Sequence, residues 1–259
     1  MSVPRFHVAR IEPPIVELCE TEARHARQSR RLSAGDAVAV FDGRGRQAFG
    51  RIHTAGGRTI RIAIDAITEV PPPRPALTLA FAPPKGPRQD AIVEKCTELG
   101  AAVLQPISTA RSVAGTSGHR LDKWQRTAIE AAKQSGQAWL PEFRPIRSLQ
   151  EVLADRAEYD LRVLLLSAGN LAAEAPRDNP APACRRGFVQ PRPIADLLAD
   201  VRAANRVLAL IGPEGGWADD EIVEAIAAGV RPVSLGPNIL RIETAAIALG
   251  AIVHSLLTR

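Results

Sequence analysis

Three short apolar runs in the second half of the chain constrain its fold most strongly. They are LRVLLL at 161–166, RVLALI at 206–211 and RPVSLG at 231–236. Because each run is apolar on both faces, it is typical of a central strand in a parallel sheet covered by helices. Further strands are expected at 77–82 and 103–107, and helices over 88–99, 119–135 and 148–157. The pattern predicts an α/β domain with a parallel sheet.

The first seventy residues follow a different pattern. Segments 36–42, 46–55 and 58–68 alternate apolar and polar side chains, as strands buried on one face do. Glycines between these segments supply turns, and the stiff PPPRP at 71–75 ends the pattern. We therefore expect a small β-barrel over residues 1–72 and the parallel-sheet domain over residues 73–259. A Pro-, Ala- and Arg-rich stretch, 172–193, is expected to be a surface loop.

Common catalytic and nucleotide-binding motifs are missing from the sequence. It contains no GxxxxGK[ST] loop, no HExxH and no GxSxG. The segment 43–48 formally matches GxGxxA, but an alternating strand follows it instead of the helix that a dinucleotide-binding turn requires. This segment is therefore interpreted as a hairpin turn. The five histidines show no ligand-like spacing, and His254 is interpreted as a packing residue on the last helix.

Composition favours a soluble globular protein. Of the 259 residues, 46% are apolar and 24% are charged, and the longest apolar runs are far too short to cross a bilayer. No apolar signal-peptide region follows Met1. The three cysteines include no CxxC pair, which favours a reducing compartment and argues against a zinc site. We expect a cytoplasmic protein without a membrane partner or a bound metal.

Basic residues gather in two separate segments. The chain has 33 Lys and Arg against 28 Asp and Glu, a net charge of +5, and all but four of the basic residues are arginine. RHARQSRR at 24–31 is one segment, and 111–147 holds seven basic side chains against three acids. Two separated segments favour a long anionic partner such as RNA. Charge alone leaves a solvated arginine-rich surface equally open.

A glycine-rich turn follows the second of the three apolar runs. In IGPEGGWADDE at 211–221, four residues with little or no side chain lie between the strand and a helix. Ligands of open α/β sheets bind at this carboxyl edge, where the main chain can approach them closely. The helix begins with Asp219, Asp220 and Glu221, whose negative charges repel a phosphate. The turn therefore suits a neutral or cationic ligand better than a pyrophosphate.

The last apolar run leads into a second motif, LGPNILRIETAAIALG at 235–250. Arg241 and Glu243 flank its turn, on the same sheet edge as Gly212. Small residues in the following helix permit close helix packing, either at a dimer interface or within the chain. These residues are Ala245, Ala246, Ala248, Gly250 and Ala251.

Four ordered motifs resemble one family. They are KGPRQDAIVEKCTELG at 85–100, WQRTAIEAAKQSGQ at 124–137, and the IGPEGG and LGPNILRIETAAIALG segments. Together they look like the RsmE family, the 16S rRNA (uracil-N3)-methyltransferases of the SPOUT superfamily. RHARQSRRLSAGDAVAVFDGRG is similar to the family's small PUA-like RNA-binding barrel. The resemblance extends over nearly the whole chain.

This resemblance implies a fold, a cofactor and an assembly. The second domain would be a SPOUT α/β fold with a C-terminal trefoil knot, active as a homodimer, and it would bind S-adenosylmethionine largely through backbone groups. By motif position, the cofactor-binding residues would be Leu166, Ile211, Gly212, Pro213, Glu214, Gly215, Leu235, Gly236 and Leu240. A sulfonium ligand agrees with the acidic start of the helix at 219–221.

The implied reaction is methylation of uracil N3 in 16S rRNA of the small ribosomal subunit. Arg241 is the candidate for stabilising the uracil anion, and Glu243 for orienting Arg241 or accepting the proton. The candidate RNA-binding residues are Arg24, His25, Arg27, Arg30, Arg31, Lys85, Arg88, Arg111 and Lys133. Three alternatives stay open: a SPOUT methyltransferase acting on tRNA, a non-catalytic RNA-binding or ribosome-assembly protein, and a nicotinamide-dependent oxidoreductase, which the missing fingerprint disfavours.

Overall fold

The structure is a computed structural model that describes residues 3–28, 32–56, 59–112, 118–167 and 190–257. The chain divides into two compact units. Unit 1 comprises residues 1–72 and 126–140, and unit 2 comprises residues 73–125 and 141–259. The predicted domain boundary at 72/73 stays a proposal, and the contacts additionally group residues 126–140 with the first unit.

Unit 1 is built on a five-stranded sheet in the order β1-β3-β4-β5-β2. The β1–β3 pair is parallel and the other pairs are antiparallel. The elements are β1 (Arg5–His7), β2 (Ile15–Glu17), α1 (Glu20–Gln28), β3 (Ala37–Phe41), β4 (Arg46–Thr54) and β5 (Arg61–Glu69). The three alternating segments thus form β3, β4 and β5, as predicted. The strands β1 and β2 were not predicted, because three residues are too few to show a period.

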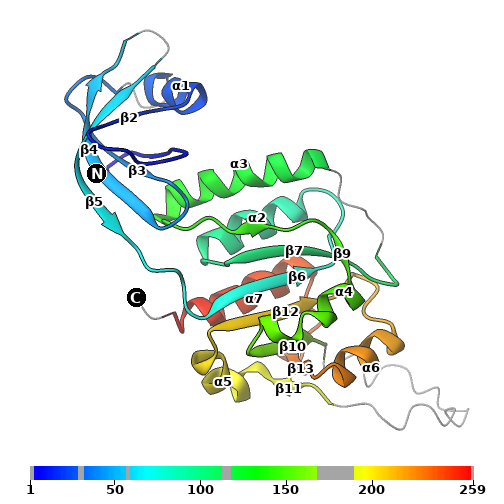
Figure 1. Ribbon diagram of the computed structural model, residues 1–259. Helices are drawn as coiled ribbons and strands as arrows, with labels where there is room; N and C mark the ends of the chain where they lie inside the picture. The colour runs from blue at the N-terminus through cyan, green and yellow to red at the C-terminus, as the bar shows by residue number, and fades with distance from the viewer. Residues whose placement is uncertain (1–2, 29–31, 57–58, 113–117, 168–189, 258–259) are drawn as a thin grey trace, which may run out of the picture. The chain divides into compact units, whose positions relative to one another are not determined.

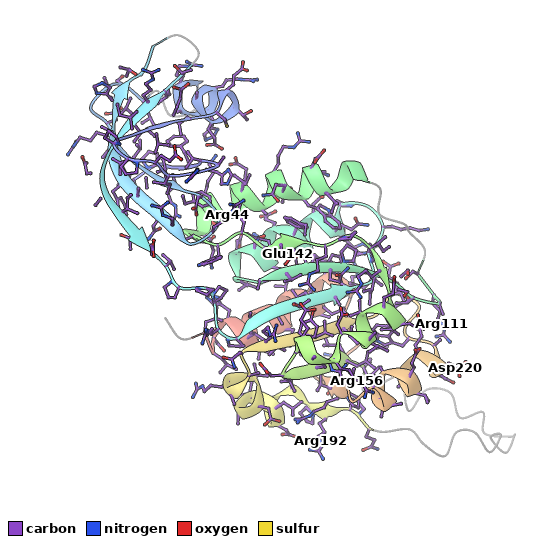
Figure 2. The ribbon with its side chains drawn as sticks, viewed as in Figure 1. Arg44, Arg111, Glu142, Arg156, Arg192 and Asp220 are labelled. Carbon is purple, nitrogen blue, oxygen red and sulfur yellow. The ribbon has the colours of Figure 1, made fainter. Side chains whose placement is uncertain are left out.

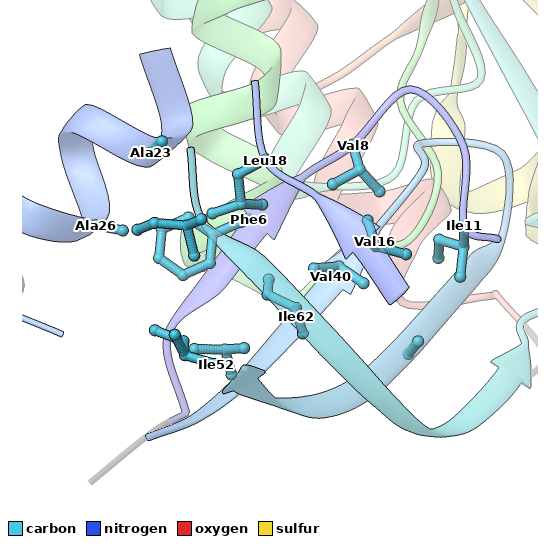
Figure 3. Close-up of a cluster of buried hydrophobic side chains, with 13 residues drawn as sticks. Phe6, Val8, Ile11, Val16, Leu18, Ala23, Ala26, Val40, Ile52 and Ile62 are labelled. Carbon is cyan, nitrogen blue, oxygen red and sulfur yellow. The ribbon is translucent and has the colours of Figure 1, made fainter. Parts of the chain in front are cut away.

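One face of this sheet forms the core of unit 1. In β4, Ala48, Gly50 and Ile52 are buried while the residues between them are exposed. Figure 3 shows the apolar side chains of this core, which come from β1, β2, β3, β4, β5 and α1. The period-two pattern of the sequence therefore separates a core face from an outward face.

The end of helix α3 (Gly118–Ser135) and the segment after it complete unit 1. The indole of Trp139 donates a hydrogen bond of 2.9 Å to the Val70 carbonyl. A Cβ on Gly45 would lie 2.6 Å from the Trp139 ring, and one on Gly43 would lie 2.6 Å from Leu140. Both glycines have positive φ and form the turn between β3 and β4. The structure confirms the hairpin interpretation and adds the packing reason for the glycines.

Unit 2 contains an eight-stranded sheet in which all the registered pairs are parallel. Its main path is β11-β13-β10-β12-β6-β7-β8, and β9 pairs with β7. The strands are β6 (Ala76–Phe81), β7 (Val103–Ser108), β8 (Glu142–Phe143), β9 (Arg147–Ser148), β10 (Leu161–Leu165), β11 (Arg192–Pro193), β12 (Arg206–Ile211) and β13 (Arg231–Ser234). The helices wholly within it are α2 (Arg88–Glu98), α4 (Leu149–Ala154), α5 (Leu198–Ala203), α6 (Asp219–Ala227) and α7 (Ile242–His254).

Helices cover both faces of this sheet (Figure 1). α4 and α6 share one apolar cluster with Leu164, Leu208 and Leu210 of the central strands. On the other side, α7 packs against α2, β6 and β12. The predicted α/β class with a parallel sheet is confirmed.

Two predictions about unit 2 need comment. The loop expected over 172–193 is wrong at its end, because residues 192–193 form β11 and pair with β13. Residues 168–189 lie outside the described part of the chain, and the trefoil knot stays a prediction.

Candidate functional site

Three neighbouring strands of unit 2 end at one edge of the sheet. β10 lies between β12 and β13, with Leu165 in register with both Ile211 and Val233. The amide of Leu166 donates a 2.9 Å hydrogen bond to the Val233 carbonyl. The segments beginning at residues 166, 212 and 235 therefore leave the sheet side by side, and they carry every residue predicted to bind the cofactor. Ligands of open parallel sheets bind at this edge.

Gly212 is required by its neighbour Trp217. A Cβ on Gly212 would lie 2.7 Å from the indole nitrogen of Trp217 and 2.8 Å from a ring carbon. Trp217 is buried, and its indole donates a 3.1 Å hydrogen bond to the Leu165 carbonyl. The indole thus ties the loop after β12 to the end of β10. The sequence suggested a ligand contact as the reason for this glycine, whereas the structure gives a packing contact inside the protein.

Two arginines bind the glycine-rich loop after β12. Arg111, which follows β7, donates a 2.9 Å hydrogen bond from Nη1 to the Gly215 carbonyl. Arg88, at the start of α2, forms an ion pair with Glu214. Figure 2 labels Arg111 and, at the start of α6, Asp220 at this end of the sheet. Both arginines were predicted to bind RNA, and in this structure both are engaged by the loop.

The carboxylate of Glu221 links this loop to the segment after β7. Its Oε1 accepts a 2.8 Å hydrogen bond from the Ala110 amide, and its Oε2 accepts one of 2.8 Å from the Ala218 amide. The side chain is buried at 7% exposure. Sequence reasoning treated Glu221 only as a charge at a helix start. A glutamate three residues into a helix is a known signal for the second of these bonds, but nothing in the sequence indicates the bond to Ala110.

The loop after β13 has free main-chain groups. Among the described residues, the backbone of 236–240 makes no hydrogen bond. Gly236 has a φ of +138°, and a Cβ placed on it would face open space. Leu240 and Ile239 are exposed. This loop therefore offers unpaired amides and carbonyls beside the loop that begins at Gly212.

Arg241 and Glu243 lie at the start of α7, at the end of this loop. Arg241 is the N-cap residue and is exposed, and it pairs with no carboxylate within the described part of the chain. Glu243 is half-buried, and its Oε2 is buried without a hydrogen-bond partner. The two side chains form no ion pair with each other. A free guanidinium and an unpaired carboxylate oxygen are thus available at the same edge of the sheet.

The small residues of α7 mainly serve packing within unit 2. A Cβ on Gly250 would lie 3.2 Å from the Leu99 side chain, and His254 Nδ1 lies 3.1 Å from the Leu99 carbonyl. Ala245 and Ala246 are buried, whereas Ala251 is exposed. The contact of Gly250 and His254 with the end of α2 supports the intramolecular reading of this helix and agrees with His254 as a packing residue.

With the geometry described, the chain can be compared with known proteins. Residues 71–254 match the profile of an RNA methyltransferase domain, and residues 18–65 match that of an RNA methyltransferase PUA domain. The ribosomal RNA small subunit methyltransferase E of Synechocystis sp. is 34% identical, over 93% of this chain and 73% of that protein. The chain belongs to the ribosomal RNA small subunit methyltransferase E family. The Mycobacterium bovis member is 32% identical, over 89% of this chain and 83% of that protein.

Solved structures of the family agree with the fold. A ribosomal RNA small subunit methyltransferase E from Neisseria gonorrhoeae, bound to S-adenosyl methionine, is 25% identical with a TM-score of 0.78, covering 98% of both chains. A Porphyromonas gingivalis protein described as a probable rRNA-methyltransferase is 29% identical with a TM-score of 0.80, also over 98% of both chains. The predicted fold class, a parallel-sheet methyltransferase domain preceded by a PUA-type domain, is confirmed.

The remaining basic residues predicted to bind RNA differ in their surroundings. Arg24 on α1 and Lys85 before α2 are exposed, whereas His25 and Arg27 are half-buried. Arg30 and Arg31 lie outside the described residues. The structure thus separates the predicted set into free side chains and side chains that already have partners.

Lys133 has partners within unit 1. Its side chain is only 9% exposed and contacts both carboxylate oxygens of Glu22 at 3.2 Å and Glu130 at 2.8 Å. Burial raises the pKa of Glu22, and the charge of Lys133 opposes this shift. Lys133 and His25 also line a pocket of about 310 Å³ in unit 1. Two carboxylates already neutralise this lysine, so it has little charge left to offer a phosphate.

Two searches of the described residues gave negative results. No group of three or more His, Cys, Asp or Glu side chains is arranged to hold a metal ion. Within the same residues, no helix is both long enough and apolar enough to span a bilayer.

Proposed function

We propose that this chain transfers a methyl group from S-adenosylmethionine to N3 of a uridine in 16S rRNA. Membership of the family supports the reaction class, and the names of its relatives support small-subunit ribosomal RNA as the substrate. The observation that carries the proposal is the convergence of three strand ends, where unpaired main-chain groups lie beside a free guanidinium. Ribosomal RNA as the substrate supports the predicted cytoplasmic location.

The residues at the sheet edge suit S-adenosylmethionine. The backbone of 236–240 has free groups for hydrogen bonds to an adenine or ribose, and Gly236 leaves open space beside it. Leu166, Ile211 and Leu235 are the apolar members of the predicted cofactor set, and Leu240 extends it from the loop after β13. When bound, S-adenosylmethionine supplies a methyl group on a positively charged sulfur. The carboxylates of Asp219 and Asp220 favour a cationic ligand over an anionic one.

Arg241 and Glu243 share the work on the uracil ring. N3 of uracil must lose its proton as the new N–C bond forms, and negative charge then develops on the ring carbonyls. Arg241 stabilises this charge, because its guanidinium has no carboxylate partner to compete. Glu243 accepts the proton through its unpaired Oε2. Alignment of the two substrates contributes a further large part of the rate.

Substitution of Arg241 tests this assignment. Arg241→Ala should lower turnover by about 100-fold or more, because one group that stabilises a developing oxyanion contributes this much. Calorimetric affinity for S-adenosylmethionine should stay within about twofold. Arg231→Ala is the matched control, since Arg231 pairs with Asp200 at the opposite end of β13. Full activity of Arg241→Ala would remove this residue from the mechanism.

We also propose that the active form is a homodimer, with the interface next to the site. The large apolar side chains exposed in unit 2 include Ile239, at 70% exposure, and Leu240, at 36%. Exposed apolar groups of this kind mark interfaces when they adjoin a functional site. Ile239→Asp should convert a dimer to a monomer in analytical ultracentrifugation. A wild-type monomer at micromolar concentration would contradict the proposal.

The alternatives can be separated by ligand and substrate. Calorimetry with S-adenosylmethionine and with NADH separates a methyltransferase from an oxidoreductase, and no binding of either would favour a non-catalytic RNA-binding protein. Methylation of bulk tRNA instead of small subunits would favour the tRNA enzyme. Steep loss of RNA affinity with salt is expected if five or more phosphates are neutralised.

A further inference from the structure

Phe49 lies in the middle of β4 with its aromatic ring exposed to solvent. It is 49% exposed, although it belongs to the most regular strand pair of unit 1. Ala48 and Gly50 on either side of it are buried. The alternation therefore turns the ring away from the core, onto the outward face of the sheet.

The residues beside Phe49 leave the ring uncovered. Its cross-strand partners are Ala39 on β3 and Ala66 on β5. Directly opposite residues on neighbouring strands share a face of the sheet, so a methyl group flanks the ring on each side. An aromatic side chain between two alanines presents a flat, accessible surface for stacking.

Positive charge accompanies this aromatic ring. Unit 1 holds thirteen Lys and Arg against nine Asp and Glu, so it carries four of the five net positive charges of the chain. Arg51 lies two residues along β4 on the same face and is exposed. Its Nη1 donates to the Gly35 carbonyl at 3.2 Å, and it pairs with no carboxylate among the described residues. The acid nearest to Phe49 in the register is Asp65, in a bulge of β5.

We propose that the outward face around Phe49 binds an unpaired nucleotide of the RNA substrate, with the base stacked on the ring and Arg51 against the phosphate. This inference rests on the proposed function, since it presumes RNA as the substrate. Stacking on exposed aromatics of a β-sheet, with arginine beside them, is a general way to hold single-stranded nucleic acid. The match of residues 18–65 to a PUA domain of RNA methyltransferases agrees with RNA as the partner.

A second protein chain fits this face less well. Ile67 is exposed too, but it is paired with the buried Ala48 and so belongs to the other side of the sheet. Ile15 is on the outward face, two strands away on β2. One ring among alanines and an arginine is a small apolar area compared with the core of a stable protein interface.

The test compares single-stranded and double-stranded RNA. The probes are a labelled 12-nucleotide oligouridylate and a labelled 12-base-pair RNA duplex, and binding is measured by fluorescence anisotropy. Phe49→Ala should weaken oligouridylate binding by about 5-fold to 150-fold, the range for loss of one stacked base. Binding of the duplex should change less than twofold, since its bases are not free to stack. Arg51→Ala should weaken both probes.

Three further variants make the test specific. Phe49→Trp should restore or improve binding of the oligouridylate, whereas Phe49→Leu should not, because leucine keeps the apolar area without the π-face. Ile67→Ala is the control for loss of an exposed apolar side chain on the other side of the sheet. Equal oligouridylate affinity for Phe49→Ala and wild type, or full rescue by Phe49→Leu, would overturn the proposal.

Two more measurements separate this inference from the proposed function. Calorimetry with S-adenosylmethionine should give the same affinity for Phe49→Ala and wild type. If wild-type protein methylates small subunits while Phe49→Ala binds RNA normally, only the stacking proposal fails. If wild-type protein transfers no methyl group, the proposed function fails whatever Phe49 does. Loss of a dimer in ultracentrifugation of Phe49→Ala would assign this face to a second copy of the chain and contradict the proposal.

Discussion

The sheet edge of unit 2 and the outward face of unit 1 are built for contact in different ways. The sheet edge presents mainly backbone groups, held in place by buried side chains such as Trp217 and Glu221. The outward face of unit 1 presents side chains, with Phe49 and Arg51 exposed on a regular strand. The first design depends on residues that never touch the ligand, whereas in the second each exposed residue acts by itself.

Glu221→Ala should break the unit 2 design most severely. Loss of a buried carboxylate that accepts two amide hydrogen bonds leaves both amides unpaired, at a cost of about 3 kcal/mol in the free energy of unfolding. The affinity for S-adenosylmethionine should fall with it, because the loop after β12 loses its link to Ala110. Urea unfolding and calorimetry measure the two effects. The exposed Glu224→Ala, which loses one bond to Gln150, should change each by far less.

Gly212→Ala should give the next largest effect. The new Cβ would lie 2.7 Å from the Trp217 indole, so the buried ring must move and release the Leu165 carbonyl. Overpacking of this kind costs about 2 kcal/mol. Gly215→Ala is a matched control, because its Cβ would meet Arg111 no closer than 3.4 Å. Equal cofactor affinity for the two alanine variants would contradict the role given to Trp217.

In unit 1, Glu22→Gln tests whether buried charge matters there. Removing this carboxylate takes away one partner of Lys133, but Glu130 remains and the raised pKa of Glu22 shows that burial already disfavours its charge. The expected loss is about 1 kcal/mol in thermal unfolding. Glu17→Gln breaks the exposed pair with Arg61 and should cost less than half as much. A larger loss for Glu17→Gln than for Glu22→Gln would reverse the assignment.

The smallest expected effect concerns pH. Burial lowers the pKa of His7, although the backbone and charge of Asp42 oppose this. The folded state therefore favours the neutral imidazole, and its contribution to stability is present above the ordinary pKa of 6.5 and is lost as pH falls through the lowered value. Between pH 7.5 and 5.5, the wild type should lose more stability than His7→Phe in urea unfolding. Parallel losses in both proteins would contradict this linkage.

The sequence predicted the regular elements better than the contacts between them. The apolar runs that became β10, β12 and β13 are fully buried strands of adequate length, so their pattern was readable. β8, β9 and β11 have only two residues each and exist because a neighbouring strand pairs with them. No period in the sequence marks strands of this kind.

The candidate site was predicted in a similar, partial way. The glycines of the loop after β12 and the segment at 235–241 pointed to the correct sheet edge. The bond between Glu221 and Ala110 joins residues 111 positions apart, and the pair of Lys133 with Glu22 spans the same separation. Such long-range contacts have no signature in one sequence. Trp217 was missed for another reason, since a tryptophan after two glycines carries no motif of its own.

The central claim is methylation of uridine N3 in 16S rRNA, and one measurement tests it most directly. The pure protein is incubated with S-adenosylmethionine and unmethylated small ribosomal subunits, with bulk tRNA in a parallel reaction. The digested nucleosides are then analysed by mass spectrometry. The account predicts 3-methyluridine in 16S rRNA alone. A different methylated nucleoside, methylation of tRNA alone, or no methyl transfer despite cofactor binding would contradict it.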